Sequence, residues 1–456
     1  MSIATINRFI QIFNDALESL SAKASLAEVE QLAMMVHRSL NPANRAYHDS
    51  SHVLPLSQVG NPRQKLAALF HDSVYLQLDR GFEPHVRARL DDAVQMEAGE
   101  VRLRSVAIMD SELSICLQLF GYEPGQVLPA FGGMNEFLSA VLATRLLKRY
   151  LSTVDLIAVA ACIEATIPFR GPDAKGRSAA QVLAQRVLAQ LQERVAGIST
   201  DQAQAAATAI VRDAVGLANR DVGGFADPDA RSFLSSTWLL IEESNAPLNA
   251  VGVYSIQEYR EALMRMDRFL SNLSPASVYQ SFDGYPHNDI IDRLQTAAGR
   301  NISFAVSYLR AKIATIAIVE ACASCTGGDC PVSMLLGDIR GSDGKPDRVE
   351  DFLPQAPVGP DFHADLLQVL ERGRSVNSRT DLTESPVTAF VYRSLGHEGT
   401  ESLMESARAL YADRMTPLEF LRSTDRGTVL AIIRACSKIA LSRSESLRSL
   451  EGSLRA

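Results

Sequence analysis

Two short stretches decide how this sequence is interpreted: RAYHDSSHV at residues 45–53 and LAALFHDSVY at residues 66–75. Residues four apart lie on the same face of a helix, so we expect His48 and His52 to point to one side. The His71-Asp72 doublet would come from the following helix. Imidazoles combined with a carboxylate suit divalent transition metals. The spacing therefore predicts a metal site.

Around these stretches, apolar residues recur three and four positions apart, as at Ile6, Phe9, Ile10 and Phe13, and alternation with period two is rare. This pattern predicts an all-α protein. We expect helices over the following ranges: 6–17, 27–40, 62–76, 134–150, 153–165, 178–195, 200–218, 229–243, 256–272 and 300–321.

The domain boundaries are expected where composition changes. Residues 322–362 are rich in Gly and Pro, which predicts a connector between a unit at 1–321 and a helical C-terminal unit at 363–456. The apolar stripe of those last helices could pack on the first unit or on a second copy, giving a homo-oligomer. The tail SESLRSLEGSLRA is expected to fray.

Composition excludes several classes of protein. The chain has 456 residues with 45 Lys plus Arg against 53 Asp plus Glu, a net charge of −8 and no long basic run, so nucleic acid is not expected as a partner. Charged residues interrupt the N-terminal segment, and no run of 18 apolar residues occurs. We therefore expect a cytoplasmic protein that does not bind membranes. Six cysteines are too few for a disulfide framework.

The pattern RxYHxxxH followed by LxxxFHDxVY resembles the HD superfamily of metal-dependent phosphohydrolases, particularly bacterial predicted phosphohydrolases of that superfamily. The YHxxxHV segment is also similar to cyclic-nucleotide phosphodiesterases. The resemblance implies an HD-domain helical bundle, here with additional C-terminal helices. It further implies that His52, His71 and Asp72 bind the metal and that His48 protonates the leaving oxygen.

The family also needs a distant aspartate. Asp221 is our first choice, because it follows a long amphipathic helix and precedes a glycine pair that allows close approach to an ion or ligand. Asp155 and Asp213 are the alternatives. The alternative role for Asp221 itself is structural: it would cap a helix beside a glycine turn and bind no metal.

Other polar residues are weaker candidates. Arg45, Lys65 and Arg170 could hold a phosphate group, or could be ordinary surface charges. Glu164 lies on an otherwise apolar helix, where it would either support or join the metal ligands or form an internal ion pair with Arg170. His85 could support the site, although an exposed loop histidine is the favoured interpretation, and a second metal is in doubt.

Together these features predict a metal-dependent hydrolase of a phosphomonoester or phosphodiester, with nucleotides among the candidate substrates. One Mn, Fe, Co, Ni or Zn ion per chain is expected. Two alternatives stay open: a regulatory or scaffolding protein with a vestigial or nucleotide-sensing site, and an HD-like iron oxygenase. Cys322, Cys325 and Cys330 form an incomplete zinc set that we expect to be dispensable.

Overall fold

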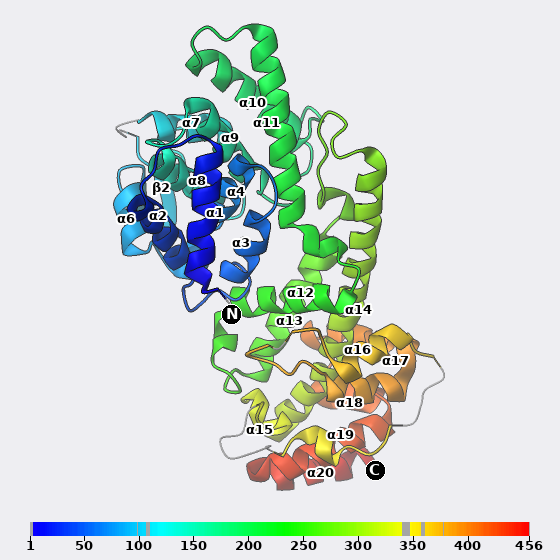
Figure 1. Cartoon of the computed structure of the whole chain (residues 1–456). Coiled ribbons are helices and arrows are strands. Elements are labelled where there is room, and N and C mark those ends of the chain that lie inside the picture. The colour runs from blue at the N-terminus through cyan, green and yellow to red at the C-terminus, as the bar shows by residue number, and fades with distance from the viewer. Residues whose placement is uncertain are drawn as a thin grey trace. The chain divides into compact units, whose positions relative to one another are not determined.

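The computed structural model describes residues 3–97, 99–105, 110–339, 347–356, 361–376 and 378–455. Within these ranges it contains twenty α-helices and one two-stranded sheet (Figure 1). The predicted all-α class is confirmed. The chain forms two compact units: Met1–Ala226 with Ser274–Ala298, called unit 1, and Asp227–Leu273 with Gly299–Ala456, called unit 2.

This division differs from the one predicted from composition. The expected connector at 322–362 belongs to unit 2, where Cys322 and Val349 are fully buried. The short helices of this segment pack on helix α19 (Arg426–Ile439). Residues 340–346 and 357–360 of the expected connector lie outside the described residues. The chain passes from one unit to the other after Ala226, after Leu273 and within the long helix α14 (Asn288–Thr326).

Unit 1 is a helical bundle with a small antiparallel hairpin. Its main elements are α1 (Thr5–Ser19), α2 (Leu26–Ser39), α3 (Ser50–Ser57), α4 (Pro62–Phe70), α5 (Leu76–Asp79), α6 (Pro84–Leu90), β1 (Val94–Glu97), β2 (Glu100–Leu103), α7 (Ser111–Phe120), α8 (Met134–Leu147), α9 (Thr153–Ala165), α10 (Ala179–Arg194) and α11 (Thr200–Asp221).

Helix α9 lies at the centre of unit 1 and explains how the bundle is built. Every residue from Leu156 to Ala165 is buried, and α4, α7, α8, α10 and α11 all pack against it. A helix that is apolar on all sides must be surrounded by others. Ser152 begins it with a capping box, which satisfies backbone N–H groups of the first turn.

Unit 2 is also helical. Its α-helices are α12 (Ala230–Ser244), α13 (Ile256–Asn272), most of α14, α15 (Val332–Leu336), α16 (Ala364–Arg372), α17 (Pro386–Tyr411), α18 (Pro417–Ser423), α19 and α20 (Ser444–Arg455). Helix α14 is long and apolar enough to cross a membrane, but 72% of its most apolar window is buried in the protein. The apolar composition of α14 is therefore equally typical of a helix buried in the core of a protein.

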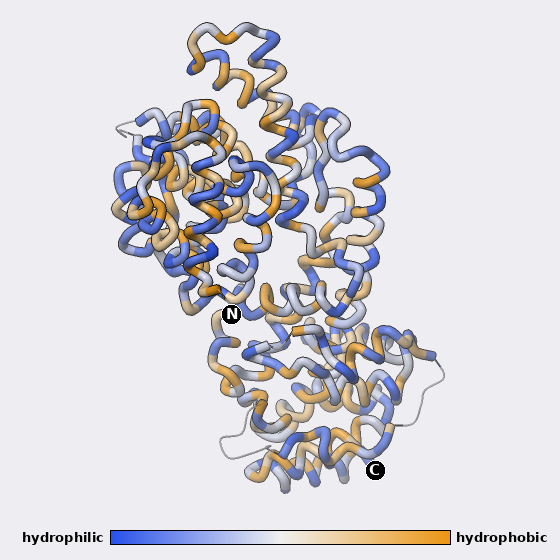
Figure 2. The backbone as a smooth tube through the Cα atoms, viewed as in Figure 1, coloured by the Kyte–Doolittle hydropathy of each residue, from blue (hydrophilic) through white to orange (hydrophobic). Residues whose placement is uncertain are grey.

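The C-terminal tail corrects a prediction. Residues 444–455 form helix α20, in which Leu447 and Leu450 are buried and which packs on α19. Hydrophilic and hydrophobic residues alternate around its turns in Figure 2. The leucines recur at helical spacing, so tertiary packing stabilises a segment whose composition suggested fraying.

Candidate metal centre

Helix α3 and the loop before it carry two of the predicted histidines. The side chain of Asp49 caps the helix by accepting a hydrogen bond from the Ser51 amide at 2.7 Å. His52 therefore lies in the first turn, whereas His48 precedes the helix. The expectation that both histidines share one helical face is wrong; the loop still brings the His48 ring centroid to 6.1 Å from that of His52.

Helix α4 delivers the His-Asp doublet at its C-terminal end. The helix begins with an Asn61 capping box and Pro62, and ends at Phe70, so His71 is its C-cap rather than a residue of its interior. His71 Nδ1 donates a hydrogen bond to the Ala68 carbonyl at 2.8 Å. Because a carbonyl can only accept, Nδ1 carries a proton and the Nε2 lone pair is left for another partner.

Helix α11 supplies the distant carboxylate, as its last residue. Asp221 Oδ1 lies 2.9 Å from His52 Nε2 and 3.2 Å from His71 Nε2. Asp72 Oδ2 lies 3.0 Å from His71 Nε2 and 3.8 Å from His52 Nε2. Four side chains from three separate helix ends thus converge on one point, with Asp221 in the position expected for the distant aspartate.

The chemistry of these atoms fits a cation. The ligand atoms of His52, His71 and Asp72 all lie within 4.8 Å of one another. His71 Nε2 and Asp72 Oδ2 are buried, and the contacts described for them are ion pairs within the cluster itself. Imidazole nitrogens and carboxylate oxygens turned toward one point are a donor set that a divalent transition metal fits.

The electrostatics lead to the same conclusion. Burial alone would lower the pKa of His71, but the carboxylates of Asp72 and Asp221 raise it well above its ordinary value. Burial opposes ionisation of Asp72 and Asp221, yet the adjacent His71 holds the pKa of both carboxyls far below the usual range. The site therefore takes up a positive charge, as a proton or as a metal ion.

Both arginines that were proposed to bind phosphate form ion pairs with carboxylates of the protein. Arg45 is buried and forms a bidentate pair with Asp79 at 2.9 and 2.7 Å. It also donates hydrogen bonds to the carbonyls of His48 and Asp72, at 3.1 and 2.6 Å. Arg45 thus ties the His48 loop to the His-Asp segment, and its charge is already neutralised.

The second of these arginines is Arg170, which pairs with the buried Glu164 at 2.6 Å. Arg186 approaches the same carboxylate at 3.9 Å. Glu164 is therefore part of an internal ion pair, the structural alternative left open by the sequence, and it touches none of the metal-site residues in any described contact.

The remaining candidates lie away from the centre. Lys65 lines a surface hollow beside Arg8 and Asp15. His85 is in helix α6, where its Nε2 is 3.0 Å from Ser39 Oγ, so it is neither a support of the described ligands nor a loop residue. The two alternative aspartates are also placed elsewhere: Asp155 pairs with Arg63 at 2.7 Å, and Asp213 contributes its carbonyl to a hydrogen bond from Gln64 at 2.6 Å.

One residue near the centre was missed. Burial raises the pKa of Glu136, in the first turn of α8, to about 7, and Asp72 and Asp221 add to the effect. Nothing in the sequence around Glu136 signals it. Arg220 follows Asn219 and precedes Asp221, but its Nη2 lies beside Gly60, in the turn before α4.

The cysteines do not form a second metal group. Among the described residues, the group of metal-ligating side chains that converges is the one at His52, His71 and Asp72. Cys322 and Cys330 are buried, Cys325 is exposed, and all three are free thiols.

Comparison with protein-family models, with curated proteins and with solved structures finds no match. The interpretation of this centre therefore depends on its own geometry and on the sequence resemblance.

Proposed function

We propose that unit 1 hydrolyses a phosphoric ester at a divalent-metal centre held by His52, His71, Asp72 and Asp221. The observation that carries this proposal is the convergence of these four side chains, with two imidazole nitrogens and two carboxylate oxygens turned toward one point. The substrate class comes from the HD-superfamily resemblance. A bound divalent ion supplies Lewis acidity and lowers the pKa of water at the site.

The chain itself orients the ligands. The Ala68 carbonyl fixes the tautomer of His71, and a hydrogen-bonded second nitrogen is the usual way to orient a metal-binding imidazole. Arg45 anchors the backbone of both the His48 loop and Asp72. Arg45 is therefore a positioning residue in this proposal, and no longer a group that contacts phosphate.

His48 is the proposed proton donor to the leaving oxygen. Its ring stands against Tyr75, with centroids 4.8 Å apart, and its centroid lies 6.1 Å from that of His52; its positive charge also lowers the pKa of Asp72. A histidine placed at the rim of the ligand set can deliver a proton without being needed to hold the ion.

Metal analysis followed by an assay of the full chain tests the proposal. Protein loaded with Mn, Fe, Co, Ni or Zn is expected to hold one ion and to hydrolyse p-nitrophenyl phosphate, bis-p-nitrophenyl phosphate or a member of a nucleotide panel. Asp155→Asn is the matched control, since Asp155 caps α9 and pairs with Arg63 away from the ligands. A wild-type protein that binds none of the five metals would refute the proposal.

The same preparation separates the alternatives. Two iron atoms per chain with oxygen consumption would indicate an oxygenase. Nucleotide binding by protein without metal, and with no hydrolysis, would indicate a regulatory protein. One ion with hydrolysis of a phosphate ester supports the function proposed here.

A further inference from the structure

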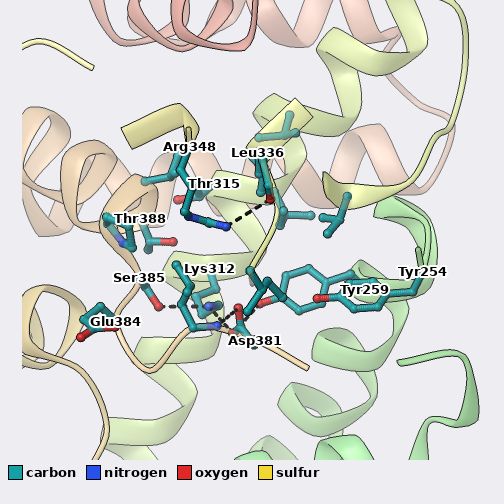
Figure 3. Close-up of a pocket in the computed structure, with 18 residues that line it drawn as sticks. Tyr254, Tyr259, Lys312, Thr315, Leu336, Arg348, Asp381, Glu384, Ser385 and Thr388 are labelled. Carbon is teal, nitrogen blue, oxygen red and sulfur yellow. Dashed lines mark hydrogen bonds and ion pairs between the residues drawn. The ribbon is translucent and has the colours of Figure 1, made fainter. Parts of the chain in front are cut away.

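Unit 2 contains a cavity of about 60 Å³ that the proposed function does not use. It lies between α14, α15 and the start of α17, and Figure 3 shows its lining. One water needs roughly 10–15 Å³ of such space, so the cavity has room for about four to six waters or a small organic molecule. Its walls are apolar at Ile316, Val319, Val332 and Leu336.

The opposite end of the cavity is polar and is organised around Lys312. This lysine is 5% exposed, and its Nζ donates hydrogen bonds to Asp381 Oδ2 at 2.9 Å and to Ser385 Oγ at 3.0 Å. The ammonium also lies 4.8 Å from the ring centroid of Trp238. Figure 3 shows Lys312, Ser385 and Asp381 next to one another at this end.

Two cations share one carboxylate in this cluster. Asp381 is shared by Lys312 and by Arg374, whose Nη1 is 3.8 Å from Oδ2, and it also accepts a hydrogen bond from Tyr259 at 2.9 Å. The nearby carboxylate of Glu242 is held by Ser378 and Thr380, and pairs with neither cation in the described residues. A single carboxylate in the cavity would give Lys312 a second anionic partner.

Helix α17 leaves donors unsatisfied at the same place. Ser385 occupies the N-cap position, but its hydroxyl is used by Lys312 and by Tyr308, 2.9 Å away, so it does not cap the helix. The first-turn N–H groups of Val387 and Thr388 have no acceptor within the helix. Thr388 is 5% exposed and lines the cavity, and its hydroxyl makes no hydrogen bond in the described structure.

From these observations we infer that the cavity binds a small monocarboxylate with a short apolar chain, its carboxylate at Lys312, Thr388 and the α17 N-terminus and its chain against Val319 and Leu336. Asp381 and the exposed Glu384 also line the cavity, and their negative charge disfavours a dianion such as phosphate. The ammonium group of an amine ligand would be repelled by the positive charge of Lys312 and would find no hydrogen-bond acceptor on that side chain.

Calorimetric titration of the full chain with sodium 3-methylbutanoate tests the inference. The carboxylate is expected to bind saturably with one site per chain, its amide at least about 10-fold more weakly, and 3-methylbutylamine and inorganic phosphate not at all, because a hydrogen bond to a charged group contributes more than one to a neutral group. No saturable binding of the carboxylate, or equal binding of the amide, would overturn it, as would tighter binding of the amine or of phosphate.

Variants locate the site. Thr388→Val should weaken carboxylate binding about 10-fold. Thr315→Val is its matched control and should leave binding unchanged, because Thr315 also lines the cavity but its hydroxyl already bonds the Ala311 carbonyl at 2.9 Å. Leu336→Trp should fill the cavity and abolish binding. Unchanged binding in Thr388→Val or in Leu336→Trp, with normal circular dichroism, would contradict the assignment.

Discussion

The two units each bury a cluster of charged side chains, and the two clusters are satisfied in different ways. In unit 1, Asp72 and Asp221 face the Nε2 atoms of His52 and His71. In unit 2, Asp381 is saturated by Lys312, Tyr259 and the Leu382 amide. The first cluster obtains positive charge only when a histidine is protonated or a cation binds, whereas the second contains a lysine.

This difference indicates what each cluster contributes. Removing one partner of a satisfied buried ion pair leaves an uncompensated charge and destabilises the fold. Above the pKa of His71, removing a carboxylate from the unit 1 cluster breaks no ion pair, relieves repulsion between carboxylates and weakens cation binding. Matched substitutions in the two clusters should therefore affect different measurements.

The largest effect is expected from Asp72→Asn. Loss of this anionic ligand should reduce metal affinity by more than about 100-fold, beyond the usual effect of losing an outer partner of a ligand, and turnover should fall to background. The unfolding midpoint of metal-free protein should change little at a pH above the pKa of His71, where the His71–Asp72 ion pair is absent. Elemental analysis and thermal unfolding check both statements; a variant that keeps one ion per chain would exclude Asp72 as a ligand.

Next in size is His48→Ala, which separates catalysis from metal binding within unit 1. We expect metal content to be unchanged and turnover to fall about 100-fold to 10,000-fold, the usual contribution of a general acid. The loss should be smaller for p-nitrophenyl phosphate, whose leaving group hardly needs a proton. If metal is lost as well, His48 is a ligand and the proton donor is another residue.

Asp381→Asn is the counterpart of Asp72→Asn in unit 2. It leaves Lys312 and Arg374 without a carboxylate partner and should lower the free energy of unfolding by about 3–5 kcal/mol. The chain has a single tryptophan, Trp238, which contacts both cations, so its fluorescence reports denaturation of this unit. Metal content should stay at the wild-type level, and a fall would show that the two clusters are not independent.

The pH dependence of metal-free protein sharpens the comparison. The folded-state pKa of His71 is raised, so its stabilising contribution is complete below the unfolded value of about 6.5 and is lost as pH rises through the folded value. Asp72 and Asp221, with lowered pKa values, contribute above about pH 4 and lose their contribution as pH falls through the folded values.

The unit 1 cluster should therefore stabilise metal-free protein most between about pH 4 and 6.5. Because the metal competes with the proton on His71, its affinity should rise with pH above this range. Denaturant titrations with and without metal from pH 4 to 9 measure both trends. Metal affinity that is independent of pH would contradict competition at His71.

The smallest effect concerns the cysteines and revises the expectation that replacing them has little consequence. Cys322 is fully buried, so Cys322→Ser places a hydroxyl in an apolar core and should cost about 1–3 kcal/mol of stability. The exposed Cys325 is the matched control, and Cys325→Ser should be neutral. Equal stability of the two variants, measured by Trp238 fluorescence, would show that the buried hydroxyl finds a partner.

The local sequence predicted a helix start well wherever an N-capping residue directly precedes a run of apolar residues at helical spacing. Ser152 and Ser255 mark helix starts with capping boxes, and α9 and α13 begin directly after them. The boundaries predicted from composition differ from those of the two compact units. Gly and Pro favour turns, and turns occur inside packed units as well as between them. The prediction that the C-terminal tail frays was wrong because its leucines pack on α19. Composition alone does not reveal this packing.

The candidate site shows the same limit. His52 and the His71-Asp72 doublet could be named from the sequence because their residue types and motif are local features, although the helical-face argument for His48 and His52 was wrong. The partners of Arg45 and Arg170 were not readable, because Asp79 and Glu164 are brought to them by tertiary packing. An arginine whose charge is already neutralised by an ion pair with a carboxylate of the protein is not available to bind a phosphate group.

The sequence alone determined the helical class, most helix starts and the residue types of the metal centre, because caps, periodicity and donor chemistry depend on neighbouring residues. Tertiary structure decided that Asp221, and not Asp155 or Asp213, faces the histidines, since the three lie on different helix positions of similar composition. It also decided that Lys312 and Thr388 meet at one cavity. Such convergence depends on how helix ends pack, and no local pattern encodes it.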